Sequence, residues 1–350
     1  MSAPVPAAAA AHPDCPQLVY ADDHEPGITR RRVRHGWGYW DAEGRRITDR
    51  DAIERLNRIG LPPAYHDAWF CPDPNGHIQA TGFDEKGRKQ YRYHPDFRAA
   101  QEAAKYDRCG AFGAALPGLR RQVEADLARR GLTRERAVAA VVRLLDLGRI
   151  RVGNEAYAQA NRSFGATTLR TRHAEVKGQK LRLAFRAKSG KTRMMTITDA
   201  TLSRFVRRCQ DLPGQHLFQW LDAEGVAHPV SSTDVNAYIR AAMGDDFTAK
   251  HFRTWGASVI AFETIACAAA PVGLKAVLAP VTDALGNTPA IARKSYVHPR
   301  LIELARDPAA QAAFRERLRL PRTTRYLNRY ERGLIAFLAE GDGSAMMQAA

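Results

Sequence analysis

The segment ARKSYVHPR, residues 292–300, surrounds a single tyrosine, Tyr296, with basic side chains. An isolated phenol has a pKa of about 10, so it attacks at neutral pH only where cations or a base favour the phenolate. The same density of positive charge would suit a surface that holds a phosphate backbone. The segment therefore predicts a DNA-facing surface or a nucleophile.

Four further side chains, at separated points of the chain, are of the types that phosphodiester cleavage requires. Negative charge grows on the non-bridging oxygens of an attacked phosphate, and the planar guanidinium of arginine can bind two such oxygens at once. The leaving alkoxide needs a proton from a general acid, and a side-chain nucleophile divides the reaction into two easier steps. The chain offers cations at Arg151, Lys188 and Arg253, and a turn amide at Asn287.

The local sequence predicts which elements carry the first of these residues. In TRERAVAAVVRLLDLG the apolar residues recur on one helical face, so Arg151 would follow a helix that begins after Thr133 and stops at Gly148. In KLRLAFRAKSGKTRMMTIT the large apolar residues Leu181, Leu183 and Phe185 alternate with Arg182, Ala184 and Arg186, which is typical of strands. Lys188 would therefore lie at a hairpin tip.

Two helix starts are predicted near the remaining candidates. Thr248 would be the N-cap of the helix that carries Arg253. The Gly-Asn-Thr-Pro turn that contains Asn287 would start another helix, with Pro289 at its first position.

Each candidate also has a structural interpretation. Arg151 and Arg253 could pair with carboxylates such as Glu155 or Glu263, and Asn287 could serve only as a turn residue. A lysine at a hairpin tip is usually just solvated. A tyrosine without its context is most often a packed aromatic with a solvated hydroxyl.

The distribution of these patterns predicts an α+β fold with two main domains. Residues 20–97 are rich in aromatics and turn signals, which indicates a small strand-rich domain. Residues 98–340 would form a larger, mostly α-helical domain that contains a three-stranded sheet. Residues 1–19 are expected to be a disordered leader, and residues 341–350 a flexible tail.

Charge and composition narrow the class of partner. The 350-residue chain has a net charge of +16, which suggests a polyanion such as nucleic acid. It contains no apolar run long enough to span a membrane, so a membrane partner is not expected. The five cysteines are scattered without a CxxC pair, which favours a reducing cytoplasm and indicates neither disulfides nor a zinc site. The sequence also lacks a P-loop and an acidic metal cluster.

Five segments in order, IRVGNEAY, FGATTLRTRHAEVKG, FRAKSGK, KHFRTWGAS and LGNTPAIARKSYVHP, resemble the type IB DNA topoisomerases, in particular their poxvirus-like and bacterial branch. The resemblance covers roughly residues 20–310. It implies a C-shaped, two-domain clamp around duplex DNA. It also implies relaxation of supercoils through a 3′-phosphotyrosine, strand rotation and religation, without ATP, an obligatory metal or another cofactor.

The resemblance also implies roles for individual residues. Tyr296 would be the nucleophile, and Arg151 and Arg253 would hold the scissile phosphate. Lys188 would be the general acid for the 5′-hydroxyl, with Arg151 assisting. Asn287 would donate a hydrogen bond to a non-bridging oxygen, at a position where several relatives have histidine; an amide donates but does not titrate.

Residues outside this set are expected to hold DNA. The segment GRKQYRYH resembles the family's DNA-contacting segment, and in a strand Tyr91 and Tyr93 would share one face. Basic residues near Tyr296 would set its electrostatic field and bind neighbouring phosphates. The candidate DNA-binding residues are Gln90, Tyr91, Tyr93, Arg88, Lys89, Arg30, Arg31, Arg32 and Lys294, with Arg293 and Arg300 as further neighbours of Tyr296.

Two other functions fit parts of the sequence. A tyrosine recombinase uses similar chemistry, but the Lys-His-Phe-Arg segment, Asn287 and the strand-rich amino-terminal region depart from the pattern of that family. A non-catalytic basic DNA-binding protein would require only the basic composition of the chain. The preferred hypothesis is a type IB topoisomerase that acts on double-stranded DNA as a monomer, in the cytoplasm and associated with the nucleoid.

Overall fold

The computed structural model describes residues 11–12, 15–244 and 247–348, so most of the expected leader and the last residues of the expected tail lie outside the described residues. The chain separates into two compact units, residues 1–105 and 106–350. The boundary falls inside helix α2 (Pro95–Ala128), a little beyond the expected position.

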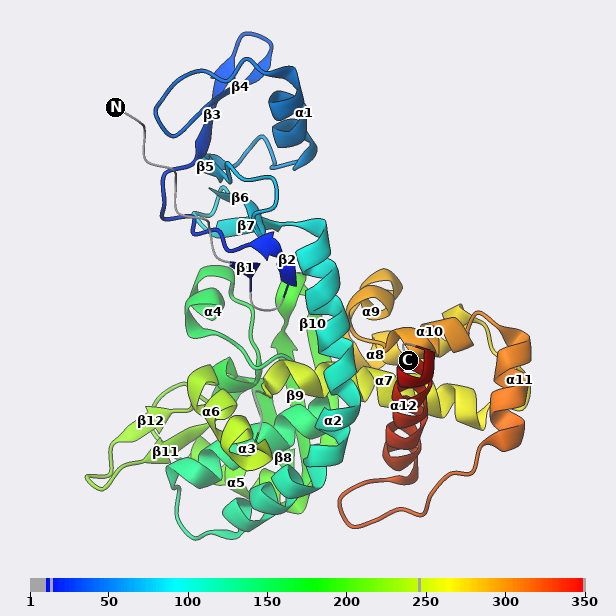
Figure 1. The fold of residues 1–350 in the computed structure, drawn as a ribbon. Helices are drawn as coiled ribbons and strands as arrows, with labels where there is room; N and C mark the ends of the chain where they lie inside the picture. Colours follow the sequence, from blue (N-terminus) through cyan, green and yellow to red (C-terminus); the bar gives the residue numbers. More distant parts are fainter. Residues whose placement is uncertain (1–10, 13–14, 245–246, 349–350) are drawn as a thin grey trace. The chain divides into compact units, whose positions relative to one another are not determined.

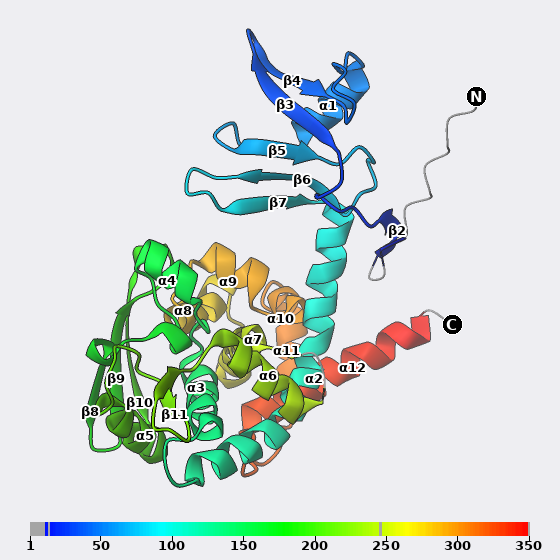
Figure 2. The ribbon, with the colours of Figure 1, turned by 90° about the vertical axis from the view of Figure 1, so that its left-hand side faces the viewer.

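The first unit is built around a five-stranded antiparallel sheet with the order β4-β3-β5-β6-β7, as Figure 2 shows. Helix α1 packs on one face of this sheet, because Leu56 of α1 belongs to the same buried cluster as Tyr39 and Phe70. The strand-rich prediction is confirmed. The elements are β3 (Ile28–Val33), β4 (Gly36–Trp40), α1 (Arg50–Arg58), β5 (His66–Phe70), β6 (Ile78–Phe83) and β7 (Lys89–Tyr93).

The expectation of a disordered leader is wrong for residues 15–19. These residues form strand β2 (Cys15–Val19), which pairs with the short strand β1 (Ala11–His12). Cys15 and Leu18 are each only 2% exposed. The backbone of Val19 donates to Asn75 and accepts from His77, both at 2.9 Å. Buried apolar side chains and backbone pairing thus offset the entropy of ordering this segment.

The second unit is mostly helical and contains a three-stranded antiparallel sheet with the order β10-β9-β8, as predicted (Figure 1). A small hairpin of β11 and β12 interrupts the later helices. After α2, the elements are α3 (Arg134–Gly148), α4 (Glu155–Asn161), β8 (Ala174–Lys177), β9 (Lys180–Arg186), β10 (Thr192–Thr198), α5 (Ala200–Gln210), β11 (Gln219–Leu221), β12 (Ala227–Pro229), α6 (Ser232–Met243), α7 (Ala249–Cys267), α8 (Leu274–Leu285), α9 (Pro289–Ser295), α10 (Pro299–Leu304), α11 (Pro308–Arg317) and α12 (Arg329–Gln348).

Strand β9 shows why this sheet forms. Its residues alternate between exposed and buried, and Leu181, Leu183 and Phe185 on the buried face are at most 4% exposed. Their side chains join the large core of the unit, to which α3 and α5 also contribute. The alternation in sequence therefore predicted both the strand and its buried face.

Helix α3 begins as predicted and ends one residue later than predicted. The Thr133 hydroxyl accepts the Arg136 N–H at 3.4 Å, so Thr133 is the N-cap. Gly148 remains helical, and a Cβ there would come within 2.9 Å of Met195. The left-handed residue that ends the helix is Arg149, with φ 51°. Gly148 therefore permits close packing against Met195, and Arg149 is the residue that ends the helix.

Helix α7 crosses the middle of the core. Most of its residues are buried, among them Phe252, Trp255 and Phe262. It begins after the predicted N-cap Thr248, whose N–H donates to Nδ1 of His251 at 3.0 Å. Within the described part of the chain, no helix combines the length and the apolar character that spanning a membrane requires. Helix α12 continues to Gln348, so the expected flexible tail is helical as far as that residue.

Candidate active site

Arg151 lies in a loop that a close backbone approach holds in place. Arg149 turns the chain after α3, and the Ala166 N–H then donates to the Arg151 carbonyl at 2.8 Å. A Cβ on Gly165 would lie 2.6 Å from that carbonyl oxygen. Only a glycine permits the approach, so the motif residues around Gly165 fix the loop that presents Arg151.

Arg253 is buried on α7, and two main-chain carbonyls hold its guanidinium. Nη1 donates to the Arg149 carbonyl at 2.5 Å, and Nη2 donates to the Leu285 carbonyl at 3.2 Å. The two acceptors lie at the C-terminal ends of α3 and α8. Carbonyls at helix C-termini lack an intrahelical partner and carry the negative end of the helix dipole. They therefore stabilise a buried cation in one orientation.

Tyr296 follows α9 and faces Arg253. The guanidinium carbon of Arg253 lies 4.8 Å from the centroid of the phenol ring. The backbone of Tyr296 donates to Ala292 at 3.1 Å, and its carbonyl faces the Ser258 hydroxyl at 3.5 Å. The same hydroxyl accepts the His298 N–H at 3.0 Å, so Ser258 fixes the chain on both sides of the tyrosine.

The electrostatics of this pair favour the phenolate. Burial by itself would raise the pKa of Tyr296, but the charge and hydrogen bonding of Arg253, the charge of Arg151 and the amide of Asn287 outweigh it. The net result is a pKa below the ordinary value of a tyrosine. Burial lowers the pKa of Arg253 to about 10, which leaves its guanidinium charged at neutral pH.

Asn287 lies in the turn between α8 and α9. Gly286 adopts the left-handed conformation, with φ 66°, and Pro289 begins α9 as predicted. The Oδ1 atom of Asn287 accepts from Nη2 of Arg151 at 3.3 Å. Its Nδ2 atom is buried and meets no acceptor in hydrogen-bonding geometry among the described residues. The amide nevertheless lies near enough to the Tyr296 phenol to help lower its pKa, and its two N–H bonds leave room for a further acceptor such as a phosphate oxygen.

Lys188 lies at the tip of the β9–β10 hairpin, as predicted, in a short turn over residues 188–190. Its side chain is exposed. It lines a pocket of about 400 Å³ whose wall also contains Arg151, Arg253 and Tyr296. The structure thus brings these four side chains together, and Asn287 joins them through Arg151.

The alternative of ion-paired structural arginines is wrong. Glu155 binds Arg170 and, at 3.2 Å, His216. Within the described ranges, neither Arg151 nor Arg253 forms an ion pair with any carboxylate, Glu263 included. The described lining of the pocket therefore concentrates positive charge and contains no Asp or Glu, which suits an anionic ligand.

Sequence reasoning missed two arginines near the pocket, Arg149 and Arg193. The left-handed conformation of Arg149 has no clear signal in the sequence, because glycine or asparagine usually occupies such positions. Arg193 did have a signal. It lies opposite Phe185 and so occupies the buried face of β10, where an arginine requires partners.

The expected cations around Tyr296 divide into two groups. The side chains of Arg293 and Lys294 are exposed on α9. Arg300 instead donates to the carbonyls of Phe337 and Leu338, at 2.7 and 2.9 Å, and lies over the ring of Phe337. Arg300 therefore has a structural role at helix α12, and the expectation that it binds DNA is corrected.

In the first unit, Arg30 also has a structural role. Its guanidinium donates to the carbonyls of Leu61, Pro62 and Tyr65, at 2.7, 2.5 and 3.1 Å. Burial lowers its pKa, and it lies over the ring of Trp37. Because both Nη atoms donate to the main chain and Nε is buried, the expectation that Arg30 contacts phosphate is corrected.

Three other candidates in this unit are paired with carboxylates. Arg88 binds Asp84 at 2.7 Å, and the Gln90 amide donates to the same carboxylate at 3.1 Å. Lys89 binds Asp23 at 2.7 Å. These side chains could contact DNA only by sharing or exchanging their partners.

The remaining candidates are exposed. Tyr91 and Tyr93 are each 40% exposed, and their rings stack at 5.8 Å. Strand register places Trp69 and Trp40 on the same face as Tyr91, opposite the face that α1 covers. Arg31 lies on this face, over Trp40 at 4.9 Å, whereas Arg32 is exposed on the other face of β3. This aromatic and basic face includes Trp40 and Trp69, which were not among the candidate DNA-binding residues.

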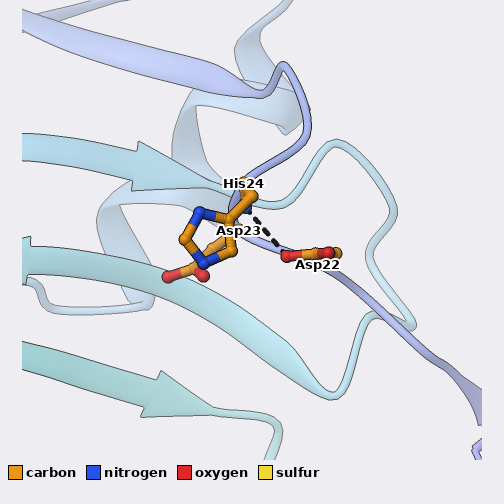
Figure 3. A group of neighbouring side chains, drawn as sticks. All are labelled: Asp22, Asp23 and His24. Carbon is orange, nitrogen blue, oxygen red and sulfur yellow. Dashed lines mark hydrogen bonds between the residues drawn. The ribbon is translucent and has the colours of Figure 1, made fainter.

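Asp22, Asp23 and His24 form a group that could in principle bind a metal ion (Figure 3). The backbone N–H of His24 donates to Asp22 at 2.9 Å, and Lys89 neutralises Asp23. Local hydrogen bonding and Lys89 thus account for the cluster, and we do not assign a metal site to it.

Comparison with known proteins identifies the family. Residues 94–291 match the family described as eukaryotic DNA topoisomerase I, catalytic core, and residues 36–84 match the bacterial DNA topoisomerase IB, N-terminal domain. The DNA topoisomerase 1B of Acanthamoeba polyphaga mimivirus is 31% identical over 280 residues, which cover 76% of this chain and 83% of the viral protein.

Among solved structures, the XerH site-specific recombinase bound to difH substrate matches with a TM-score of 0.36 and 16% identity, over 54% of this chain and 52% of the recombinase chain. The family models and the viral relative favour the topoisomerase hypothesis. On the evidence of its catalytic core, its amino-terminal domain and its viral relative, this chain belongs to the type IB DNA topoisomerase family.

Proposed function

We propose that this type IB topoisomerase relaxes supercoiled duplex DNA through a covalent 3′-phosphotyrosine on Tyr296. The observation that carries the proposal is the convergence of Arg151, Lys188, Arg253 and Tyr296 on one pocket. These side chains come from four separate elements, so their proximity is a property of the fold. Together they supply the nucleophile, the phosphate donors and the acid that phosphodiester cleavage requires.

In the proposed cleavage step, the phenolate oxygen of Tyr296 attacks phosphorus, and the bond from phosphorus to the 5′-oxygen breaks. The phenol proton passes to solvent, and Lys188 gives a proton to the leaving 5′-oxygen. Arg151 and Arg253 bind the non-bridging oxygens, and the Nδ2 amide of Asn287 donates to one of them. Religation is the reverse of the same step, with the 5′-hydroxyl as nucleophile.

The energetics require no fuel. Cleavage exchanges one phosphodiester for another, so the cleaved and religated states should be of similar free energy. The strain of supercoiling drives rotation of the free 5′ end while Tyr296 holds the 3′ end. We therefore propose that both positive and negative supercoils are relaxed without ATP and without a divalent metal ion.

We further propose that both units contact the same duplex, as the resemblance to a DNA clamp suggests. Monomeric action is supported by the pocket, because one chain supplies Arg151, Lys188, Arg253 and Tyr296 to it, and Asn287 contacts Arg151 beside it. We propose a cytoplasmic, nucleoid-associated location in a bacterial cell. The five free cysteines fit a reducing cytoplasm, and the amino-terminal domain is of the bacterial type.

Trapping the covalent adduct tests the proposal. The protein is incubated with labelled duplex in EDTA, denatured with detergent and resolved on a gel. Wild type should give a protein–DNA adduct and Tyr296→Phe should give none. Tyr157→Phe is the matched control, since Tyr157 lines the same pocket without the Arg253 contact, and it should still give the adduct.

Three results would reject the mechanism. They are no adduct with wild type, an adduct that persists in Tyr296→Phe, or a strict requirement for magnesium or ATP in plasmid relaxation. Efficient strand exchange between two duplexes, with no relaxation of a plasmid, would instead support the recombinase hypothesis.

A further inference from the structure

Arg193 lies on the strand that leads away from the Lys188 turn, yet its side chain reaches another element. It pairs with Phe185 in the β9–β10 register, on the buried face of the sheet. Its Nη1 donates to the Asp283 carbonyl at 3.0 Å, and its Nη2 donates to the Ala284 carbonyl. Arg193 therefore joins the hairpin to the last turn of α8.

Two arginines bind three successive carbonyls of this turn. Directly after the carbonyls that Arg193 holds, the Leu285 carbonyl accepts from Nη2 of Arg253 at 3.2 Å. Carbonyls of a last helical turn have no intrahelical partner, so guanidinium groups both satisfy them and complement the helix dipole. Gly286 then reverses the chain and Asn287 follows. A shift of this helix end would displace Asn287 and Arg253 together.

The hairpin end that carries Lys188 is short and closed. The Ala187 N–H donates to the Lys191 carbonyl at 2.8 Å, and the Gly190 N–H donates to the Ala187 carbonyl at 3.1 Å. The Lys188 side chain is exposed, and within the described ranges no hydrogen bond or ion pair holds it in place. Its position relative to the phosphate donors thus depends on what holds the hairpin, and Arg193 lies just beyond this turn.

We propose that Arg193 is a positioning residue that ties the Lys188 hairpin to the turn bearing Asn287, so that the acid and the phosphate donors keep a fixed separation. This inference rests on the roles proposed above for Lys188 and Asn287. It assigns Arg193 no contact with the reacting atoms.

A direct phosphate contact by Arg193 does not fit its geometry. Both Nη atoms already donate to carbonyls, and Nε is buried. Arg149 and Arg151 lie close enough to lower its pKa further, after burial, so an additional cation here is electrostatically unfavourable. The two carbonyl contacts explain why an arginine is nevertheless present.

The test compares Arg193→Ala and Arg193→Lys with wild type in single-turnover cleavage of a duplex oligonucleotide. A displacement of about 1 Å in a catalytic group costs on the order of 100-fold in rate. We expect a loss of about 10- to 100-fold for Arg193→Ala, and a similar loss for Arg193→Lys, because an ammonium keeps the charge but not the fork that holds two carbonyls.

A second substrate separates positioning from a general loss of structure. A bridging 5′-sulfur at the scissile phosphate leaves as a thiolate and needs no proton from Lys188. Cleavage of this substrate by Arg193→Ala should recover most of the lost rate. Lys188→Ala should recover in the same way. The double variant Arg193→Ala/Lys188→Ala should cleave the oxygen substrate about as fast as the slower single variant, because both changes disable the same function.

Arg182→Ala is the matched control. Arg182 lies on β9 of the same sheet and is exposed, and among the described residues its one carboxylate partner is Glu175, at 3.4 Å. Its removal should leave cleavage of both substrates within about twofold of wild type. Thermal unfolding of each variant shows whether the fold is retained, and Arg193→Lys provides the comparison if Arg193→Ala unfolds.

Three outcomes overturn the proposal. They are wild-type cleavage by both Arg193 variants, an equal loss on the sulfur and oxygen substrates, or strictly additive losses in the double variant. Failure of the underlying mechanism is distinguishable, because Lys188→Ala would then show no recovery on the sulfur substrate whatever Arg193 does.

Discussion

The guanidinium of Arg253 lies 4.8 Å from the ring of Tyr296 while two helix-end carbonyls, of Arg149 and Leu285, hold it from behind. The cation therefore cannot turn away from the phenol without breaking hydrogen bonds in a buried site. This fixed geometry lowers the pKa of Tyr296 despite the opposing effect of burial. Preorganised charge of this kind stabilises a developing anion without reorganisation during the reaction.

The first prediction concerns Arg253→Lys. A lysine retains one positive charge but cannot bind two carbonyls and the phenol in a fixed plane. We expect cleavage to slow by roughly 100-fold, the effect of losing one preorganised donor. The measurement is the single-turnover rate of adduct formation at saturating protein.

The same variant has a predicted pH dependence. Arg253 lowers the pKa of Tyr296 in wild type, so the phenolate forms, and the cleavage rate rises, at a lower pH than for an ordinary tyrosine. Weakening that interaction raises the phenol pKa, so the rising limb of the rate profile should move to higher pH in Arg253→Lys. A profile that moves to lower pH, or does not move, would contradict this assignment.

The second prediction concerns the buried Nδ2 of Asn287, the amide that we propose as a phosphate donor and that also helps lower the pKa of Tyr296. Asn287→Asp preserves the shape but replaces the donor with a negative carboxylate beside the phosphate site. We expect cleavage to fall by about 100- to 1,000-fold, as when one oxyanion donor is removed. Asn287→His restores a donor and should lose much less. Equal rates for the Asp and His variants would argue against a donor role.

The third prediction concerns Gly165, where a Cβ would lie 2.6 Å from the carbonyl of Arg151. Gly165→Ala must move the loop that carries Arg151, so we expect a loss of about 1–3 kcal/mol in the free energy of unfolding, together with slower cleavage. The control is Gly118→Ala, where a Cβ would meet only the Ala242 carbonyl at 3.8 Å. Urea unfolding and single-turnover cleavage would measure the two effects. A Gly165 variant as stable and active as the control would refute the packing argument.

The fourth prediction separates two neighbouring arginines of the first unit. Arg30→Ala removes the donor to three carbonyls and should cost about 1–3 kcal/mol of stability. Arg32→Ala, at an exposed position, should leave stability within about 0.5 kcal/mol and lower the salt dependence of DNA affinity by about one ion. Urea unfolding measures the stability of both variants, and a salt titration of duplex binding measures the salt dependence of their DNA affinity. Reversed effects would restore Arg30 as a DNA contact.

These two arginines also indicate what the sequence could and could not predict. The strands, the N-cap Thr133 and the hairpin tip at Lys188 follow from local periodicity and capping, so the sequence was sufficient for them. Whether Arg30 binds carbonyls or phosphate depends on where distant main-chain segments lie. The same holds for Arg193, whose acceptors on α8 are about 90 residues away in the chain.

The leader shows the same limit. The burial of Leu18 depends on a backbone pairing with residues 75–77, which no local pattern predicts. Tyr296, Arg151 and Arg253 were found because a family resemblance placed them in order, and the periodicity of the chain alone would not have joined them.

The fifth prediction concerns the buried ion network of the second unit. Arg120 on α2 binds Asp146 of α3 at 2.8 Å and Glu331 of α12 at 2.7 Å, so it links three helices. Glu331 is 6% exposed, and its carboxylate also accepts the backbone N–H of Asn328 at 2.9 Å. Removing one member of a buried ion network leaves an uncompensated charge in a poorly solvated site.

Glu331→Gln keeps the shape of the side chain and removes only its charge. We expect the free energy of unfolding to fall by about 3 kcal/mol, because the Arg120 guanidinium loses one of its two carboxylate partners. The matched control is Glu124→Gln, which breaks an exposed pair with Arg325 at 2.8 Å and should leave the urea midpoint unchanged. Circular dichroism in a urea titration measures both variants. Equal midpoints would mean that the network contributes no more than a surface ion pair, and that apolar packing alone joins α12 to the core.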